Sequence, residues 1–193
     1  MSAPPTARFD ILLEGGLSPG VRSSCSLIRD GDHAIVVDPG LSPSQAAILE
    51  PLAAFGLAPE DVTDVIISHH HPDHALNVAL FPAARVHDHW AIYDFFGRWD
   101  DDDAEGRVVS PAVTLIRTPG HTAEDVSTLV RTEDGLVVCT HVWWTDSVPV
   151  EDPYATDPDA LHASRARVLG LPGLARIVPG HGTSFVPSDA TPR

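Results

Sequence analysis

Lysine is missing from this sequence of 193 residues, and each of its 12 basic residues is an arginine. We take this absence, together with the abundance of Ala and Pro, as a compositional bias rather than a functional signal. The 27 acidic residues give the chain a formal net charge of −15 at pH 7. Proteins that bind nucleic acid use clusters of Lys and Arg to neutralise phosphates. The charge therefore argues against a nucleic-acid partner.

Cysteine is also scarce, because Cys25 and Cys139 are the only two in the chain. Both lie in apolar, strand-like segments. In that context a buried free thiol is expected rather than a disulfide.

Long hydrophobic runs are absent as well, and no stretch approaches the roughly 20 apolar residues that cross a bilayer. The first residues, Met1 to Thr6, have neither a basic start nor an apolar core, so they do not form a signal peptide. We therefore expect a cytoplasmic protein with no membrane partner. The length predicts one domain over residues 1–193 with its core at about 9–185, and the oligomeric state is left open.

Strands and helices both follow from the pattern of apolar residues and turn signals. Strands are predicted at 9–13, 24–28, 33–38, 65–68, 112–118, 125–131, 136–139 and 175–178. Helices are predicted at 42–56, 76–80 and 157–169. Mixed strands with helices outside two sheets indicate an α/β sandwich.

Four candidate metal ligands, His69, His71, Asp73 and His74, lie within the six-residue segment His69-His70-His71-Pro72-Asp73-His74. Imidazole and carboxylate groups suit zinc, iron or manganese. Because four such ligands this close do not easily serve one ion alone, the spacing favours a two-metal centre. The apolar residues 65–67 precede the segment, which places it on a loop at the end of a strand. His70, between two of the ligands, is expected to point away from them.

Two more histidines follow predicted strands in the same way. His121 lies in Thr118-Pro119-Gly120-His121-Thr122, and His181 lies in Pro179-Gly180-His181-Gly182. In each case a Pro-Gly turn lets the imidazole stand up from the end of the sheet. Three strand ends can thus deliver ligands to one rim.

These motifs are similar to those of the metallo-β-lactamase fold superfamily over about 9–185. The H-x-H-x-D-H, T-P-G-H-T and terminal G-H-G motifs occur in the order typical of that family. Asp38 corresponds to an early aspartate that supports the ligands. The resemblance implies an αββα sandwich with metals at the rim between its two sheets.

By this resemblance, the first metal would be bound by His69, His71 and His121, and the second by Asp73, His74 and His181. The cofactors implied are two divalent ions, zinc first, with iron or manganese as alternatives. A metal-bound hydroxide would attack the substrate, and Asp73 would act as the catalytic residue by orienting that hydroxide as well as binding metal.

His141 departs from the family pattern. Most hydrolases of the superfamily have a bridging aspartate at this position, in a Gly-Asp pair, whereas this chain has Thr140-His141. His141 could bind one ion, transfer a proton or support another ligand. Asp146 lies five residues further along and substitutes poorly without a rearranged loop. A metallo-β-lactamase subclass with a similar three-His plus Asp-His-His arrangement also lacks the bridging carboxylate.

Other residues have simpler interpretations. His33, His87, His89 and His162 are expected to be structural. Strand alternation predicts that one of Trp143 and Trp144 faces the site and the other the core. The aromatic segment 90–99 is expected to pack in the core, with a pocket wall as the alternative, and the acidic run 100–103 to form a solvated loop.

The leading functional hypothesis is a metallo-hydrolase acting on a small-molecule ester, thioester, lactone or related bond. A two-domain glyoxalase II needs a helical substrate domain, for which the 12 residues after His181 leave no room. The other hypotheses are a metal-dependent nuclease or RNA-processing enzyme, a mononuclear iron dioxygenase, and a metal-stabilised binding protein without turnover.

Overall fold

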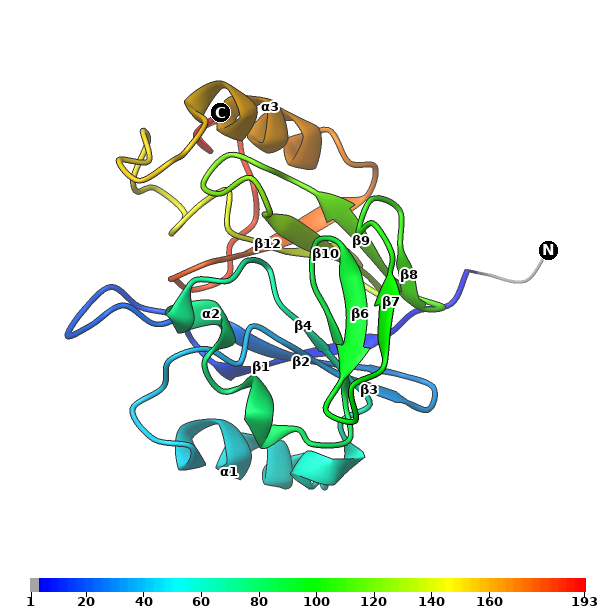
Figure 1. Ribbon diagram of the computed structural model, residues 1–193. Helices are drawn as coiled ribbons and strands as arrows, with labels where there is room; N and C mark the ends of the chain where they lie inside the picture. The colour runs from blue at the N-terminus through cyan, green and yellow to red at the C-terminus, as the bar shows by residue number, and fades with distance from the viewer. Residues whose placement is uncertain (1–3) are drawn as a thin grey trace.

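Two β-sheets lie face to face in the computed structural model, which describes residues 4–193, and helices cover their outer faces (Figure 1). Helix α1 lies outside the first sheet and helix α3 outside the second. The αββα sandwich predicted from the motifs is confirmed.

The first sheet has seven strands in sequential order. They are β1 (Arg8–Leu13), β2 (Cys25–Asp30), β3 (His33–Val37), β4 (Asp64–Ile66), β5 (Arg85–His87), β6 (Ala91–Asp94) and β7 (Trp99–Asp101). Strands β3, β4 and β5 are parallel to one another, so their carboxyl ends meet at one edge. The remaining pairs are antiparallel.

The second sheet has five strands in the order β12-β11-β10-β9-β8. They are β8 (Val108–Ser110), β9 (Val113–Arg117), β10 (Val126–Thr132), β11 (Gly135–Thr140) and β12 (Leu174–Pro179). Strands β11 and β12 are parallel, and β10 runs antiparallel to both β9 and β11. Strands β9, β11 and β12 therefore end at the same edge.

The helices are short. They are α1 (Ala46–Ala54), α2 (Pro72–Ala75), α3 (Pro158–Leu169) and two 3₁₀ turns, Pro59–Asp61 and Val78–Leu80. Helix α3 is capped by Asp157, whose side chain accepts a hydrogen bond from the N–H of Ala160. None of the helices within residues 4–193 is both long and apolar enough to cross a membrane.

The hydrophobic core has three parts. Between the sheets, inward-facing residues of both, such as Ile35, Ile66, Leu115 and Val137, form one cluster. A second cluster packs under α1 around Ile48 and Leu52. The third, under α3, includes Trp143, Leu161 and Ile177.

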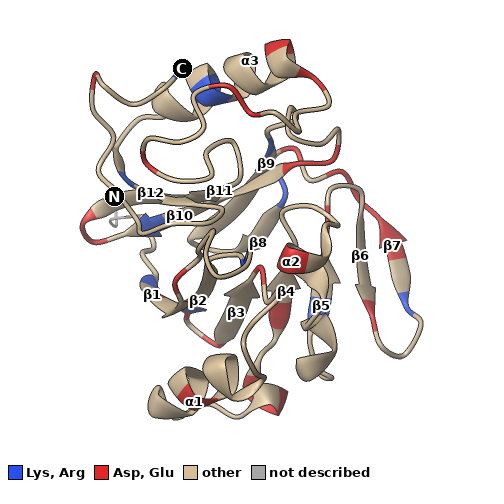
Figure 2. Cartoon of the chain, turned by 90° about the vertical axis from the view of Figure 1, so that its left-hand side faces the viewer, with Lys and Arg blue, Asp and Glu red and all other residues tan. Residues whose placement is uncertain are grey.

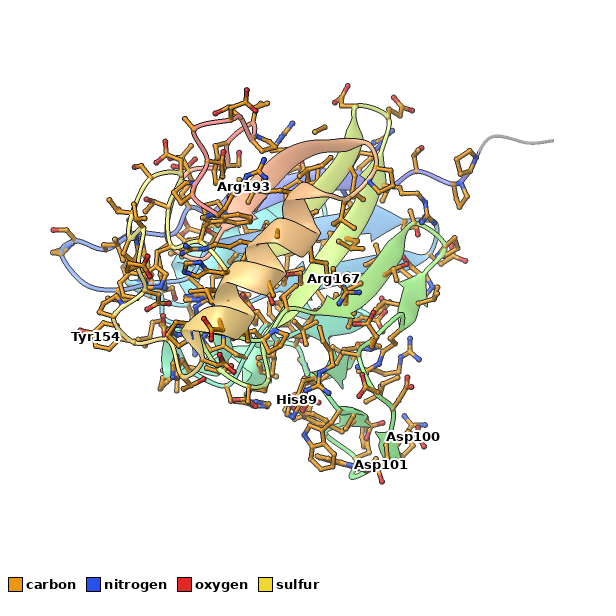
Figure 3. The ribbon with its side chains drawn as sticks, turned by 90° about the horizontal axis from the view of Figure 1, so that it is seen from above. His89, Asp100, Asp101, Tyr154, Arg167 and Arg193 are labelled. Atoms are coloured by element: carbon orange, nitrogen blue, oxygen red, sulfur yellow. The ribbon has the colours of Figure 1, made fainter. Side chains whose placement is uncertain are left out.

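Most of the aromatic segment 90–99 is exposed, so the prediction of core packing is wrong for it except at Tyr93, which packs against the second cluster. The segment belongs to the hairpin β6–β7, which projects from the body of the molecule with Asp100 and Asp101 on its outer strand (Figure 3). Phe96 is 81% exposed and Trp99 is 49% exposed. Tyr93 and Trp99 stack across the hairpin with ring centroids 4.9 Å apart, a cross-strand contact that stabilises such a ribbon.

Asp64 is a fully buried carboxylate at the start of β4. Its two oxygens contact the side chains of His33 at 3.1 Å, His87 at 2.9 Å and Arg85 at 2.8 Å. These partners come from β3 and β5, so Asp64 links three neighbouring strands. His33 and His87 thus have the structural roles predicted for them.

The two thiols are expected to resist alkylation in the native protein. Cys25 and Cys139 are free and buried, and burial raises the pKa of Cys139 to about 12 and that of Cys25 further. Because the thiolate is the reactive form, iodoacetamide should modify neither residue until the chain is unfolded. Mass spectrometry before and after denaturation measures this. Fast modification of either thiol without unfolding would contradict the burial.

Candidate metal centre

The predicted ligands meet where the carboxyl ends of both sheets come together. His69, His71, Asp73 and His74 follow β4, whereas His121, His141 and His181 follow β9, β11 and β12. A hydrogen bond from the N–H of Val126 to the carbonyl of Ser68 joins the two sheets at this edge. All seven predicted side chains therefore reach one region, although their strands belong to different sheets.

The first predicted triad is closely packed. Nδ1 of His71 lies 3.0 Å from Nε2 of His69 and 3.1 Å from Nε2 of His121. In each of these two pairs the nitrogens are close enough to bind one ion with modest adjustment.

The second predicted triad lies beside it. Oδ2 of Asp73 is 3.4 Å from Nε2 of His74 and 3.7 Å from Nε2 of His181. His74 and His181 are buried, whereas the Asp73 side chain keeps 17% of its surface exposed. The carboxylate can therefore face a substrate as well as the two imidazoles.

His141 lies at the centre of the cluster. Its ring centroid is 4.2 Å from that of His121, 4.7 Å from His69 and 4.8 Å from His74. Its Nε2 is 2.9 Å from Nε2 of His181. His141 belongs to two groups of residues whose ligand atoms all lie within 4.8 Å of one another. One group also contains His69 and His121, and the other also contains His74 and His181. His141, which stands where the family commonly has a carboxylate, therefore contacts both triads.

Hydrogen-bond acceptors orient four of the imidazoles from behind. Nδ1 of His74 faces Asp38 at 2.8 Å, and Nδ1 of His121 faces Asp152 at 2.8 Å. Nδ1 of His181 faces the carbonyl of Arg22 at 3.0 Å, and Nδ1 of His69 faces the hydroxyl of Ser68 at 3.1 Å, with Asp125 further away at 3.8 Å. Such partners fix the ring and leave the other nitrogen free for a metal.

Asp38 was expected to support the ligands, whereas Asp125 and Asp152 were missed. Asp125 follows the T-P-G-H-T motif closely, a signal that could have been used. Asp152 comes from the loop before α3, and nothing in its local sequence marks it. Asp38 also accepts a hydrogen bond from the N–H of Ser68 at 2.7 Å and has a positive φ of 50°, so its placement is built into the backbone.

The donor set fits a divalent metal. Burial lowers the pKa of His69 and of His141 well below the usual value, and neighbouring imidazoles lower both further. Both rings are therefore neutral at pH 7, the form that binds metals. Nε2 of His74 and Nδ1 of His141 are buried and have no hydrogen-bond partner in the described part of the chain. Unpartnered nitrogens are costly unless something binds them.

Trp144 forms a wall beside the imidazoles. Its ring centroid lies 5.8 Å from that of His181, and it stacks on Tyr154 at 5.7 Å with the planes 2° apart. Its Nε1 donates to Asp152 at 3.0 Å, the carboxylate that also contacts His121. Trp143 instead is 1% exposed and packs on Phe185, so one indole faces the site and the other the core as predicted, although neither residue lies in a strand.

Gly180→Ala is expected to displace His141. A Cβ at residue 180 would lie 2.4 Å from Cδ2 and 2.9 Å from Nε2 of that ring. Overpacking of this kind costs about 1–3 kcal/mol, which thermal or urea denaturation would measure. Gly20→Ala is the matched control, since a Cβ there meets nothing within 4 Å. Equal stability of the two variants would contradict this packing.

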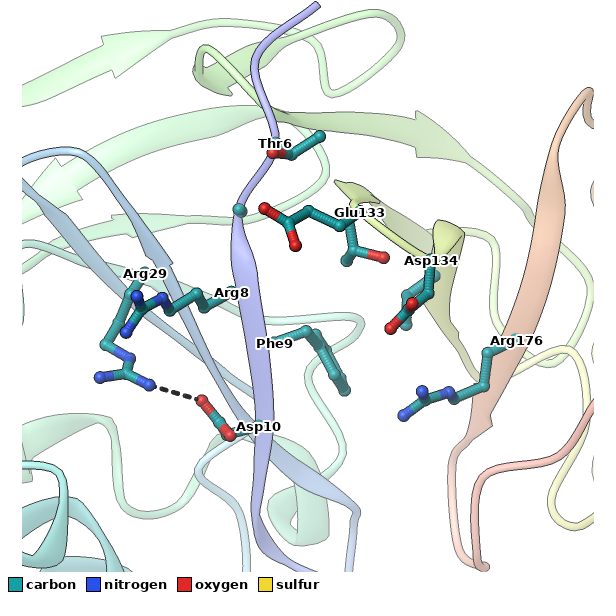
Figure 4. Close-up of a pocket in the computed structure, with 11 residues that line it drawn as sticks. Thr6, Arg8, Phe9, Asp10, Arg29, Glu133, Asp134 and Arg176 are labelled. Carbon is teal, nitrogen blue, oxygen red and sulfur yellow. Dashed lines mark hydrogen bonds and ion pairs between the residues drawn. The ribbon is translucent and has the colours of Figure 1, made fainter.

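A different pocket of about 420 Å³ lies at the opposite edge, around the start of β1 and the β10–β11 turn (Figure 4). Arg8, Arg29 and Arg176 line it together with Asp10, Glu133 and Asp134, and Arg29 pairs with Asp10 at 2.9 Å. Its opposite charges balance, and no imidazole lines it. Acidic residues outnumber basic ones in the chain, 27 to 12, and Figure 2 shows them on both sheets and near the helices.

The sequence has relatives across one superfamily. A family model described as the metallo-beta-lactamase superfamily matches residues 18–106. Metallo-beta-lactamase domain-containing protein 1 is 34% identical in Xenopus laevis, over 84% of this chain and 71% of the relative. The Mus musculus protein is 35% identical over 78% of this chain, which spans only 60% of that relative. Hydroxyacylglutathione hydrolase of Aeromonas salmonicida is 34% identical over 50% of this chain and 38% of its own length.

Solved structures share the fold. A Thermotoga maritima protein classed with the metallo-beta-lactamases has a TM-score of 0.73 at 24% identity, covering 94% of this chain and 100% of its own. A dizinc quorum-quenching lactonase has a TM-score of 0.63 at 19% identity, covering 82% and 72%. A protein solved in a di-iron-bound form has a TM-score of 0.66 at 24% identity, covering 90% and 94%.

Proposed function

Because this chain belongs to the metallo-β-lactamase superfamily, as its motifs predicted, we propose that it is a metal-dependent hydrolase of small carbonyl substrates. The observation that carries the proposal is the convergence of Asp73 and six imidazoles at the shared edge of the sheets. Thioesters and lactones are the first substrate classes to test. A relative named hydroxyacylglutathione hydrolase supports the thioester. The fold shared with a quorum-quenching lactonase is consistent with the lactone.

We assign one ion to His69, His71 and His121, and a second to Asp73, His74 and His181. Bound there, divalent ions would lower the pKa of water and polarise the carbonyl of the substrate. Zinc is the first candidate, and iron or manganese the alternatives, in keeping with the dizinc and di-iron forms of fold relatives.

The chain's own residues would position the reactants. Asp73 is the partly exposed carboxylate of the cluster, so it can accept a hydrogen bond from the attacking water and hold its proton. Trp144 and Tyr154 offer a flat apolar surface beside the imidazoles, on which the acyl part of a substrate can lie.

His141 supplies no negative charge where the family commonly has a carboxylate. Since the ring is neutral and buried, it cannot offset the charge of two cations as an aspartate would. We therefore propose that the second ion binds more weakly than the first. His141→Asp is expected to tighten that second binding step by about tenfold or more, roughly 1.4 kcal/mol. Isothermal titration of the metal-free variant and wild type measures it, and equal or weaker binding by the variant would refute this role.

The test of the activity itself combines metal content with turnover. Purified protein is analysed for zinc, iron and manganese, then assayed on chromogenic esters, thioesters and lactones. We expect up to two ions bound by the two triads, and hydrolysis that a chelator abolishes and added metal restores. Bound metal with no turnover on any substrate would instead support a metal-stabilised binding protein.

A further inference from the structure

A second cluster of metal-binding side chains lies outside the centre described above. His70 precedes His71 in the loop after β4, His89 lies between β5 and β6, and Glu124 lies between His121 and β10. The ring of His70 points away from the neighbouring imidazoles and toward Glu124. His89 lies at the base of the projecting β6–β7 hairpin (Figure 3).

Three ligand atoms in this cluster converge. Nδ1 of His70 lies 2.7 Å from Oε2 of Glu124, and Nδ1 of His89 lies 3.4 Å from the same oxygen. The three ligand atoms all fall within 4.8 Å of one another. Ligands bound at about 2.1 Å to a tetrahedral ion lie roughly 3.4 Å apart, so small side-chain movements would complete the geometry.

The cluster also contains an unexplained nitrogen. Nδ1 of His89 is buried and has no hydrogen-bond partner among the described residues, although the ring itself is partly exposed. An ion pair between His70 and Glu124 would account for those two side chains, but the 3.4 Å contact of His89 with the same carboxylate does not have hydrogen-bond geometry. A shared ion would satisfy all three.

Asp88 stands behind His70 as the carboxylates of the main centre stand behind their imidazoles. Its Oδ2 lies 3.5 Å from Nε2 of His70, and its Oδ1 accepts from the N–H groups of Trp90 and Ala91. A carboxylate in this position orients a ring whose other nitrogen binds metal. Asp88 and Glu124 bring two carboxylates to the cluster, and a divalent cation would complement their charge.

We propose that His70, His89 and Glu124 form an auxiliary divalent-cation site, of the type occupied by zinc, distinct from the two-triad centre. Its ligands come from loops of both sheets. His70 and His89 lie in loops of the first sheet, and Glu124 lies in a loop of the second. An ion there would fasten together the two loops that carry His69, His71 and His121.

The test counts ions directly, so it does not depend on catalysis. Metal-free wild type, His89→Gln and Glu124→Gln are titrated with Zn²⁺, and bound zinc per chain is measured after removal of free metal. Each variant should bind one ion fewer than wild type and lose the part of the thermal stabilisation that this ion provides. The occupancy of the main centre cancels in the difference, so failure of the proposed hydrolase would not affect the result.

Matched controls make the same chemical changes elsewhere. His162→Gln and Glu50→Gln replace exposed residues outside the cluster and should keep the wild-type zinc count. Circular dichroism checks that every variant is folded. An unchanged count in both folded cluster variants would overturn the proposal and leave the His70–Glu124 ion pair as the function of the cluster. Loss of an ion in the controls as well would also overturn it.

Discussion

Asp73→Asn is expected to lower hydrolysis of the best substrate by about 10²–10⁴-fold, the range associated with loss of a positioned acid–base group. The amide keeps the shape of the side chain but cannot accept a proton, and it is a poor partner for a cation. Because Oδ2 of Asp73 lies near Nε2 of both His74 and His181, the change also weakens the second predicted metal position. The turnover number and the metal content should both be measured.

Asp146→Asn is the matched control for this prediction. Asp146 lies on the exposed loop after His141, where its carboxylate accepts a hydrogen bond from Ser147. The same chemical change there should leave turnover and metal content near wild type. An Asp73→Asn enzyme within tenfold of wild type, with full metal content, would remove Asp73 from the proposed mechanism.

Asp64→Ala is expected to destabilise the fold by about 3 kcal/mol, because it leaves buried donors around position 64 without their acceptor. The group most affected is His87, whose side chain is almost fully buried, whereas Arg85 can turn toward solvent. Urea denaturation of the variant measures the loss. Asp32→Asn, in the neighbouring exposed β2–β3 turn, is the control and should change stability little.

The contribution of Asp64 to the stability of the fold should decrease as the pH falls. Burial alone would raise its pKa, but hydrogen bonds from His87, His33 and Thr63 outweigh burial and lower the pKa below the usual value. A carboxylate with a lowered pKa stabilises the fold above its unfolded value of about 3.9 and loses this effect as the pH falls. The stability gap between wild type and Asp64→Ala should therefore be full at pH 6 and shrink below about pH 4. A gap that widens in acid would contradict this assignment.

Motifs at strand ends made much of the centre predictable. His121 and His181 each follow an apolar run of the second sheet, which brings the ends of strands that run the same way to one edge. His69 follows an apolar run of the first sheet and joins them because the two sheets lie face to face. The residues behind the imidazoles were harder to predict. Asp152 reaches His121 through a loop whose path depends on the packing of α3, and no local pattern encodes that path.

Strands β5 to β8 were not predicted from the sequence, and the reasons are physical. Strands β5 and β8 have three residues each, too few for an alternating pattern to stand out. Strands β6 and β7 carry one aromatic residue each, Tyr93 and Trp99, and the turn between them adds Phe95 and Phe96, so the composition of this exposed hairpin resembles that of a buried segment. Burial depends on what lies opposite a residue, which a local window does not contain.

The carboxylate of Asp152 has a consequence for how specificity can change in this protein. One oxygen, Oδ2, contacts both Nδ1 of His121 and Nε1 of Trp144. A substitution of Trp144 that reshapes the apolar wall also frees Asp152 to move, and the imidazole of His121 loses its fixed orientation. New substrate preferences reached through Trp144 would thus be coupled to altered metal affinity. Substitutions at Tyr154 are less constrained. Its side chain stacks on the indole of Trp144 but does not contact the carboxylate of Asp152.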